Sequence, residues 1–248
     1  MKRASLRFYE ELNDFLPASK RKVAFDYIFE LSGSVKDMIE ALGVPHTEVD
    51  LILVNGKSVD FSYRVQDRDQ ISVYPVFESF DIAPLVQLRP RPLRQTRFGL
   101  DAHLGKLAGY LRMLGFDTLY RNDYRAEALA RISGDEGRIL LTRNRRLLMR
   151  NRVTLGYWVR ANESREQLIE VLRRFDLFGS IAPFRRCLRC NGLLQPVCKE
   201  AIVDRLPPKT RQYYDAFSIC PTCGRIYWKG SHYARMRRFI EGILEEGE

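Results

Sequence analysis

The chain has 248 residues, of which 45% are apolar and 11% aromatic, a composition typical of a folded protein and unlike that of a disordered one. Its uninterrupted apolar runs are only a few residues long, far below the roughly 20 that span a bilayer, so we expect no association with a membrane. The first residues, MKRASLRFYEEL, lack the apolar stretch of a secretory signal, and we expect a cytoplasmic protein.

The net charge of +10 is unevenly distributed along the chain. Residues 1–84 contain 10 Lys and Arg against 14 Asp and Glu, a net charge of −4, whereas residues 85–248 contain 31 against 17, a net charge of +14. A basic body with a mildly acidic head predicts that the larger part contacts phosphate groups; the alternative is that the charge serves solubility alone. Most of the basic residues are Arg, whose planar fork suits phosphate oxygens.

Residues 1–80 have the pattern of a small β-rich domain with one helix. The expected elements are, in chain order, strands in LRFYEEL and KVAFDYIF, a helix over Val35–Leu42 closed by Gly43, a hairpin in EVDLILVNGKSVDF and a strand in DRDQISVYPVF. Apolar residues at i, i+3, i+4 and i+7 predict the helix, and Asn55-Gly56 between two apolar runs predicts the hairpin turn. This order of elements predicts a β-grasp fold.

The stretches GVPHTEVDLILVNGKSV and DRDQISVYP resemble the ubiquitin-like sulfur-carrier proteins of molybdopterin and thiamine synthesis. Those carriers are activated at a free C-terminal Gly-Gly. Here the chain continues through ESFDIAPLVQ with no Gly-Gly at the boundary. The resemblance therefore implies a docking or recognition module, with a protein as its partner, rather than a sulfur carrier.

Residues 81–96 contain three prolines and are predicted to form a linker. Residues 97–183 then alternate between short strands and amphipathic helices. The expected elements are a strand in RFGL, a helix over His103–Leu114 ended by Gly115, a strand in FDTLY, a helix in YRAEALARIS, strands in RILLT and TLGYWV, and a helix in ESREQLIEVLRRF. Such alternation predicts an α/β domain with a parallel sheet covered by helices.

Two C-x-x-C pairs, Cys187/Cys190 and Cys220/Cys223, are separated by 29 residues. Thiolates at this spacing are typical of a tetrahedral Zn²⁺ site, which is structural when protein fills all four positions. Two disulfides or a redox pair are the alternatives, disfavoured without a secretion signal. The fifth cysteine, Cys198, is expected to be a small core residue.

Basic and aromatic residues surround the predicted metal site: Arg185, Arg186, Arg189, Arg225, Tyr227, Trp228 and Lys229. Such groups suit single-stranded nucleic acid, through phosphate pairing and base stacking, and we take Arg189 and Trp228 as candidate contacts. The alternative is that Tyr227 and Trp228 pack this segment onto the α/β body.

From about Arg97 to Met236 the chain resembles the "Mut-seven C-terminal" RNase family, through FGLDAHLGKLAGYLRMLGFDTLYRND, GRILLTRNRRLL and CGRIYWKGSHYARM. Residues 1–80 resemble the ubiquitin-like domain fused to that family. The resemblance implies a PIN-like nuclease fold at 97–183, a zinc ribbon with a C-terminal helix at 184–248, and RNA as substrate or ligand.

PIN-type nucleases hold one or two Mg²⁺ or Mn²⁺ ions with acidic residues at the carboxyl ends of parallel strands. Asp101 follows the first strand of the body and is the expected main ligand, with capping of the next helix as the alternative. Asp123 or Glu127 is expected to assist. Asn144 stands where the family has Asp, and can offer only a neutral carbonyl oxygen.

A second departure lies at Arg125-Ala126, where the family tends to be acidic. Arginines near these positions are expected to steady the phosphate: Arg112, Arg143, Arg145 and Arg146. Three hypotheses follow: a metal-dependent ribonuclease acting on single-stranded RNA, a catalytically weak or inactive RNA-binding module, and an adaptor that binds proteins through the β-grasp head.

Overall fold

The computed structural model describes residues 1–75 and 96–247, and these divide into two compact units. The first unit contains the described part of residues 1–95 together with residues 125–158, and the second contains 96–124 and 159–248. The predicted linker at 81–96 lies outside the described residues, except for Thr96. Among the described helices, none is both long and apolar enough to cross a membrane.

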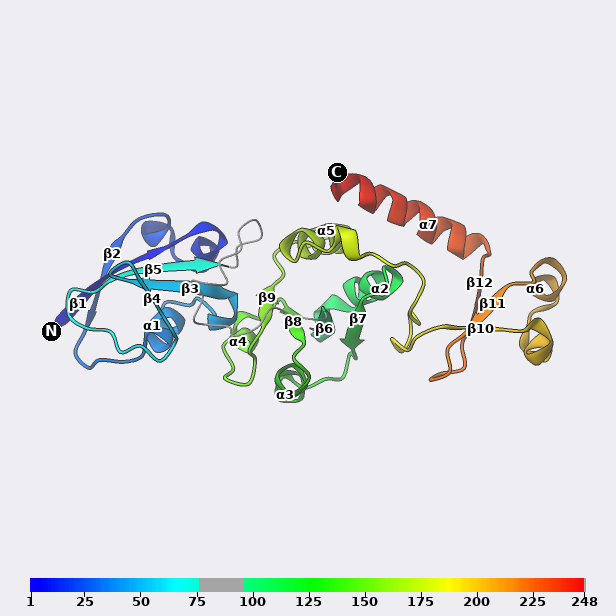
Figure 1. Cartoon of the computed structure of the whole chain (residues 1–248), viewed down its shortest axis with the longest axis horizontal. Coiled ribbons are helices and arrows are strands. Elements are labelled where there is room, and N and C mark those ends of the chain that lie inside the picture. Colours follow the sequence, from blue (N-terminus) through cyan, green and yellow to red (C-terminus); the bar gives the residue numbers. More distant parts are fainter. Residues whose placement is uncertain (76–95, 248) are drawn as a thin grey trace. The chain divides into compact units, whose positions relative to one another are not determined.

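The head is a five-stranded sheet with one α-helix, as expected for a β-grasp fold (Figure 1). The strand order is β2-β1-β5-β3-β4, with β1 parallel to β5 and the other pairs antiparallel. The elements are β1 (Lys2–Phe8), β2 (Phe25–Phe29), α1 (Val35–Ala41), β3 (Val49–Val54), β4 (Lys57–Val59) and β5 (Gln70–Pro75), with 3-10 helices η1 (Glu10–Phe15), η2 (Ala18–Lys20) and η3 (His46–Glu48).

Local sequence explains most of these boundaries. The Ser34 and Asp37 side chains form a reciprocal capping box at the start of α1. Asn55 and Gly56 both have positive φ, 50° and 78°, as a two-residue hairpin turn requires. One expectation was wrong: the first strand ends at Phe8, and most of the rest of LRFYEEL belongs to a 3-10 helix whose apolar side chains are buried in the core of the head.

Within the first unit, the head packs against the strand β9 (Gly156–Trp158) through η3. The buried Glu48 carboxylate accepts a hydrogen bond from the Trp158 backbone N–H. His46 Nε2 lies 2.9 Å from the Val153 carbonyl oxygen, and the Trp158 ring is tilted against Phe15, 5.3 Å between centroids. Residues 125–158 and the head therefore share one core.

Arg145 is part of this packing and was predicted to contact phosphate. Its guanidinium carbon lies 3.7 Å from the centroid of the Trp158 ring and 5.1 Å from that of Phe15. The side chain is half-buried, and the planar cation gains both cation–π attraction and apolar contact there. Its charged end thus faces two aromatic rings, and the contact with phosphate stays a prediction for this residue.

The central region is an α/β domain with parallel strand pairs, as predicted. β6 (Arg97–Leu100) pairs in parallel with β7 (Asp117–Tyr120), and β8 (Ile139–Thr142) with β9. The helices are η4 (Ala102–Leu104), α2 (Gly105–Met113), α3 (Ala126–Glu136), α4 (Arg145–Leu148), α5 (Ser164–Arg174) and η5 (Phe178–Ser180).

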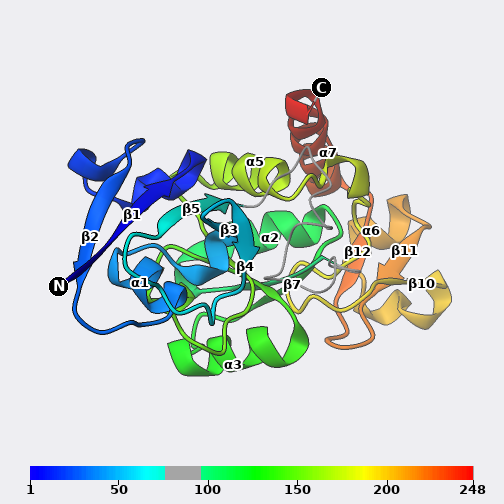
Figure 2. The ribbon, with the colours of Figure 1, turned by 60° about the vertical axis from the view of Figure 1, so that its left-hand side comes forward.

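The C-terminal region is a three-stranded antiparallel ribbon followed by a helix (Figure 2). The strands are β10 (Gln195–Val197), β11 (Phe217–Ile219) and β12 (Ile226–Trp228), in that order, and the helices are η6 (Lys199–Ala201), η7 (Val203–Arg205), α6 (Pro208–Tyr213), α7 (Ser231–Leu244) and η8 (Glu245–Gly247). Its core is small: three buried residues, Ile202, Leu206 and Phe217, with partly buried neighbours. Such a core needs a further source of stability.

We expect Arg145→Ala to lower the free energy of unfolding by about 1–2 kcal/mol, because it removes a partly desolvated cation from two aromatic faces. Arg146→Ala is the matched control, since Arg146 is exposed and its loss should cost under roughly 0.5 kcal/mol. Denaturant unfolding measures both, and equal effects would contradict the packing role.

Candidate metal centre and its anchor

The two C-x-x-C segments fold into matching turns. In the first, Cys187 N–H donates to the Gly192 carbonyl and Asn191 N–H donates to the Cys187 carbonyl, at 2.8 and 2.9 Å. In the second, Cys220 N–H donates to Arg225 and Gly224 N–H to Cys220, at 2.9 and 2.8 Å. Asn191 and Gly224 occupy the same place in each turn and share a φ of 70°. This conformation is one that Asn and Gly adopt most readily.

These turns bring the four sulfurs together. All four lie within 4.8 Å of one another, with Cys187 and Cys223 3.6 Å apart and Cys190 and Cys220 3.4 Å apart. A disulfide would need about 2.05 Å, whereas four sulfurs at about 2.3 Å from one Zn²⁺ are separated by about 3.8 Å. The four cysteines fit a tetrahedral zinc site and exclude the disulfide alternative in this structure.

Protonation within the cluster is uneven. Burial opposes ionisation of Cys187, but hydrogen bonds from the Tyr227 hydroxyl and from backbone N–H groups outweigh it and lower the pKa of this thiol to about 6. Burial and, to a lesser extent, hydrogen bonds with the neighbouring sulfurs together raise the pKa of Cys190 to about 12. Crowded thiolates repel one another, so a divalent cation is the natural replacement for their protons.

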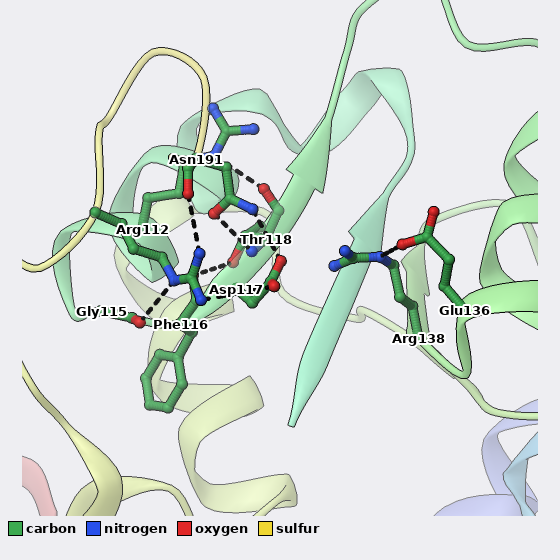
Figure 3. Close-up of polar contacts among 9 residues, drawn as sticks. Arg112, Gly115, Phe116, Asp117, Thr118, Glu136, Arg138 and Asn191 are labelled. Carbon is green, nitrogen blue, oxygen red and sulfur yellow. Dashed lines mark hydrogen bonds and ion pairs between the residues drawn. The ribbon is translucent and has the colours of Figure 1, made fainter. Parts of the chain in front are cut away.

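The first turn is anchored to the edge strand β7 by Asn191 (Figure 3). Its Oδ1 accepts from the Thr118 N–H at 2.9 Å, and its Nδ2 donates to the Asp117 carboxylate at 2.8 Å. Arg186 forms an ion pair with Asp117 at 3.6 Å and donates to the Gly115 carbonyl. One amide side chain thus joins the metal turn to the α/β body.

Arg112 completes this anchor and was predicted to bind phosphate. The side chain is 4% exposed. Its N–H groups donate to the carbonyls of Thr118, Tyr120, Leu188 and Arg189, at 2.9, 3.4, 3.1 and 3.0 Å. This buried guanidinium satisfies carbonyls of β7 and of the metal turn, and its contact with phosphate stays a prediction.

The predicted catalytic positions are divided between the units, with Asp101 and Asp123 in the second and Glu127 and Asn144 in the first. Asp101 is buried directly after β6, and its carboxylate accepts from the His103 N–H, so the capping alternative is realised. Asp123 is exposed and paired with Arg121, whose hydrogen bond lowers the pKa of the carboxyl.

The other two positions also have local partners. Glu127 is exposed in the first turn of α3, with Arg150 3.6 Å away. Asn144 is the N-cap of α4, and its Oδ1 accepts from the Arg146 N–H at 3.1 Å. Among the described residues, the group of three or more potential metal ligands that the structure brings together is the four cysteines.

The other residues predicted to contact nucleic acid differ in how exposed they are. Arg143, Arg146 and Arg189 are exposed, as a phosphate contact requires, and Trp228 is half-buried. The Tyr227 hydroxyl lies 3.1 Å from Cys187 Sγ and accepts from the Leu188 N–H, so Tyr227 belongs to the metal turn.

The fifth cysteine, Cys198, is exposed, contrary to the prediction of a core residue. It lies directly after the strand β10, which ends at Val197.

Sequence reasoning missed the anchoring role of Asn191 and Asp117. The available signal was Asn191 directly after Cys190, at the place that Gly224 holds after Cys223. A residue other than Gly at such a position has a side chain that the turn does not need and that can bond to another part of the chain. The partner on β7 is 73 residues away from it, and short-range pattern does not reveal it.

Comparison with known families agrees with this architecture. A family model described as Mut7-C RNAse domain matches residues 96–240, and one described as Mut7-C ubiquitin matches residues 1–81. The chain belongs to the Mut7-C family. A search of curated proteins and a search of solved structures each gave no match. The Mut7-C RNase match spans both the strands of the parallel sheet and the cysteine turns.

We expect the purified protein to contain one zinc ion per chain. Cys220→Ser should abolish it and unfold the ribbon, because structural zinc contributes about 10–16 kcal/mol of apparent binding free energy, more than so small a core can replace. Metal analysis by mass spectrometry and near-ultraviolet circular dichroism measure the two effects. Cys198→Ser, which alters an exposed cysteine outside the cluster, should keep the full zinc content.

We expect Asn191→Gly to lower the free energy of unfolding by about 1–3 kcal/mol, because glycine keeps the positive φ but loses both side-chain hydrogen bonds to β7. Asn191→Ala should cost about 1 kcal/mol more, since alanine also strains the backbone there. Denaturant unfolding measures both. Asn122→Gly, at an exposed position, is the control, and an equally large loss there would contradict the anchor.

Proposed function

We propose that this chain binds single-stranded RNA through its basic α/β body and ribbon, and that it cuts RNA weakly or not at all. The match to an RNase domain over residues 96–240 carries the proposal. The net charge of +14 over residues 85–248 supports it, because neutralising phosphates dominates the affinity for nucleic acid. The ubiquitin-like head is then a site for a protein partner.

The chemistry of the acidic positions supports binding better than cutting. Mg²⁺ and Mn²⁺ take oxygen ligands and depend on negative charge from the protein. Asp123 and Glu127 are each paired with an arginine, and Asn144 is neutral and occupied as a helix cap. This donor set does not fit a divalent-ion site well. The exposed arginines nearby, such as Arg143 and Arg146, repel a cation but attract phosphate.

A metal-dependent ribonuclease is the second candidate, and Asp101 favours it. This carboxylate is 7% exposed and lies directly after β6, the position at which nucleases of this kind place a metal ligand. A bound Mg²⁺ or Mn²⁺ would supply an activated water for attack on a phosphodiester. Asp101 would hold the ion, and Asp123 would assist if released from Arg121.

A single assay separates the two candidates. We expect labelled single-stranded RNA to bind the wild-type chain in the presence of EDTA and to remain intact in Mn²⁺. If about five phosphates are neutralised, the affinity should fall roughly 100-fold between about 50 and about 200 mM salt. Fluorescence anisotropy measures the binding, and gel electrophoresis measures the cleavage.

Two variants keep the local structure and change only the charge. Asp101→Asn retains a capping side chain, and Asn144→Asp does the same for α4 while adding a carboxylate. Cleavage by the wild type that requires Mn²⁺ and disappears in Asp101→Asn would establish the enzyme instead. Cleavage gained only by Asn144→Asp would support a binding protein with a reduced metal site. No binding at low salt would refute both candidates.

A further inference from the structure

The ribbon contains a pocket of about 710 Å³ at the place where β12, α6 and the first turn of α7 meet. Both ribbon views show α6 beside the strands β11 and β12 (Figures 1 and 2). The lining includes four aromatic side chains besides Tyr227: Tyr213, Tyr214, Trp228 and Tyr233. Residues of the α/β body upstream of Leu188 are not among its described lining, so the pocket belongs to the ribbon.

Two of these rings are available to a ligand. Tyr213 is 68% exposed at the end of α6, although aromatic rings are usually covered in so small a domain. Trp228 is half-buried, and within the described part of the chain its indole N–H has no hydrogen-bond acceptor. Tyr227 differs, because its hydroxyl is held by the metal turn.

Gly230 keeps the pocket open beside the indole. A Cβ at this position would lie 2.9 Å from Trp228 Nε1 and 3.6 Å from the Tyr214 hydroxyl. The first of these distances is shorter than real side chains tolerate, so any other residue would push the indole or fill the space. The glycine therefore leaves an edge of Trp228 accessible.

The charge of the pocket is positive. Lys209 and Arg225 are exposed along its wall, and no Asp or Glu is among the described residues that line it. The Lys229 ammonium lies over the Tyr233 ring, 5.9 Å from its centroid. A purely apolar ligand would make no use of these cations, whereas a nucleotide uses both kinds of group, its base on the rings and its phosphates on the cations.

A second pocket, of about 460 Å³, shares Trp228 and Tyr233 with the first and adds Phe184 and Lys229. The Phe184 and Tyr233 rings are 4.5 Å apart between centroids. Aromatic and cationic groups therefore continue past Trp228, as the path of a strand with successive bases requires.

We propose that the first pocket binds an unpaired base of single-stranded RNA, stacked on Tyr213 and Trp228, with the adjoining phosphates on Lys209 and Arg225. The inference rests on the proposed function, RNA binding, and adds the site at which a base is held. The ribbon would then grip the strand by its bases, whereas exposed arginines elsewhere grip only its backbone.

The test uses the full-length zinc-loaded protein and a fluorescein-labelled oligouridine of about ten nucleotides. Tyr213→Ala should weaken binding about 5- to 100-fold, the range for loss of one base–aromatic stack. Leu193→Ala, at another exposed apolar residue of the ribbon, is the matched control and should leave the affinity unchanged. Zinc content reports that each variant is folded.

A second pair of variants tests whether the cations of the pocket contact the phosphates. Arg225→Ala should weaken binding more than Arg238→Ala, which removes the same charge from an exposed position on α7 outside the pocket. Equal losses would mean that only the overall charge matters, and would overturn the pocket as a phosphate contact.

The two tryptophans of the chain allow a direct readout of stacking. In Trp158→Phe, Trp228 is the remaining tryptophan, and oligouridine should quench its fluorescence whereas inorganic polyphosphate should not. An oligonucleotide of abasic residues should lose the quenching and most of the added affinity. Quenching by polyphosphate to the same degree would overturn the proposal.

Failure of the inference and failure of the proposed function give different results. If the wild type binds oligouridine but Tyr213→Ala binds equally well, the pocket is not the base site and RNA binding stands. If the wild type binds none of the oligonucleotides at low salt, the proposed function fails and the inference fails with it. If a protein partner competes for the pocket while oligouridine does not bind, the aromatic surface is a protein-docking site and the proposal is wrong.

Discussion

The crowding of four cysteine sulfurs within 4.8 Å is the constraint on which the C-terminal region depends. Without a cation, burial raises the pKa of Cys190 and favours its protonated form, and a core of three buried residues cannot hold the two turns together alone. With a cation, the same sulfurs attract one centre, and the turns become the most rigid part of the ribbon. The metal thus takes the place of a hydrophobic core.

That rigidity extends to the α/β body through a few polar contacts. Asn191 joins the first turn to β7, and Arg112 reaches carbonyls on both sides of the junction. Each of these bonds is buried or half-buried, where an unsatisfied partner is costly. The order that a bound metal would impose therefore reaches β7 directly, which gives a physical reason for the family match to include body and cysteine turns together.

Much of the fold could be predicted from sequence because its signals are local. Two C-x-x-C pairs identify the metal turns, Asn55-Gly56 identifies a hairpin, and strand–helix alternation identifies the parallel sheet. The roles of individual arginines were harder to predict from the sequence. Arg112 and Arg145 look like Arg143 and Arg146 in the sequence, but one is buried among carbonyls and one lies on two aromatic rings. Arginine serves both purposes, and only long-range packing decides between them.

Long-range packing also limited what the sequence could predict of the pocket in the ribbon. Trp228 could be proposed from its place beside the metal turn, whereas Tyr213 comes from a helix that sequence pattern gave no reason to place against it. Conversely, Tyr227 looked equivalent to Trp228 but is held by Cys187. Neighbours on a strand point to opposite faces, so one can serve the metal turn while the next faces a ligand.

Asn144 combines a structural role, as a helix cap, with an electrostatic one. As the N-cap of α4 it accepts from the Arg146 N–H, and aspartate would cap the helix equally well. Capping therefore explains why asparagine is tolerated but not why the negative charge is missing. The electrostatic consequence is clear, because the position lies next to Arg143, Arg145 and Arg146 in the chain. Removing a carboxylate from such a run weakens attraction for a divalent ion and strengthens attraction for phosphate by the same Coulomb term. Under the proposed function, this neutral side chain favours a polyanion over a metal ion at this segment, without altering the fold that presents it.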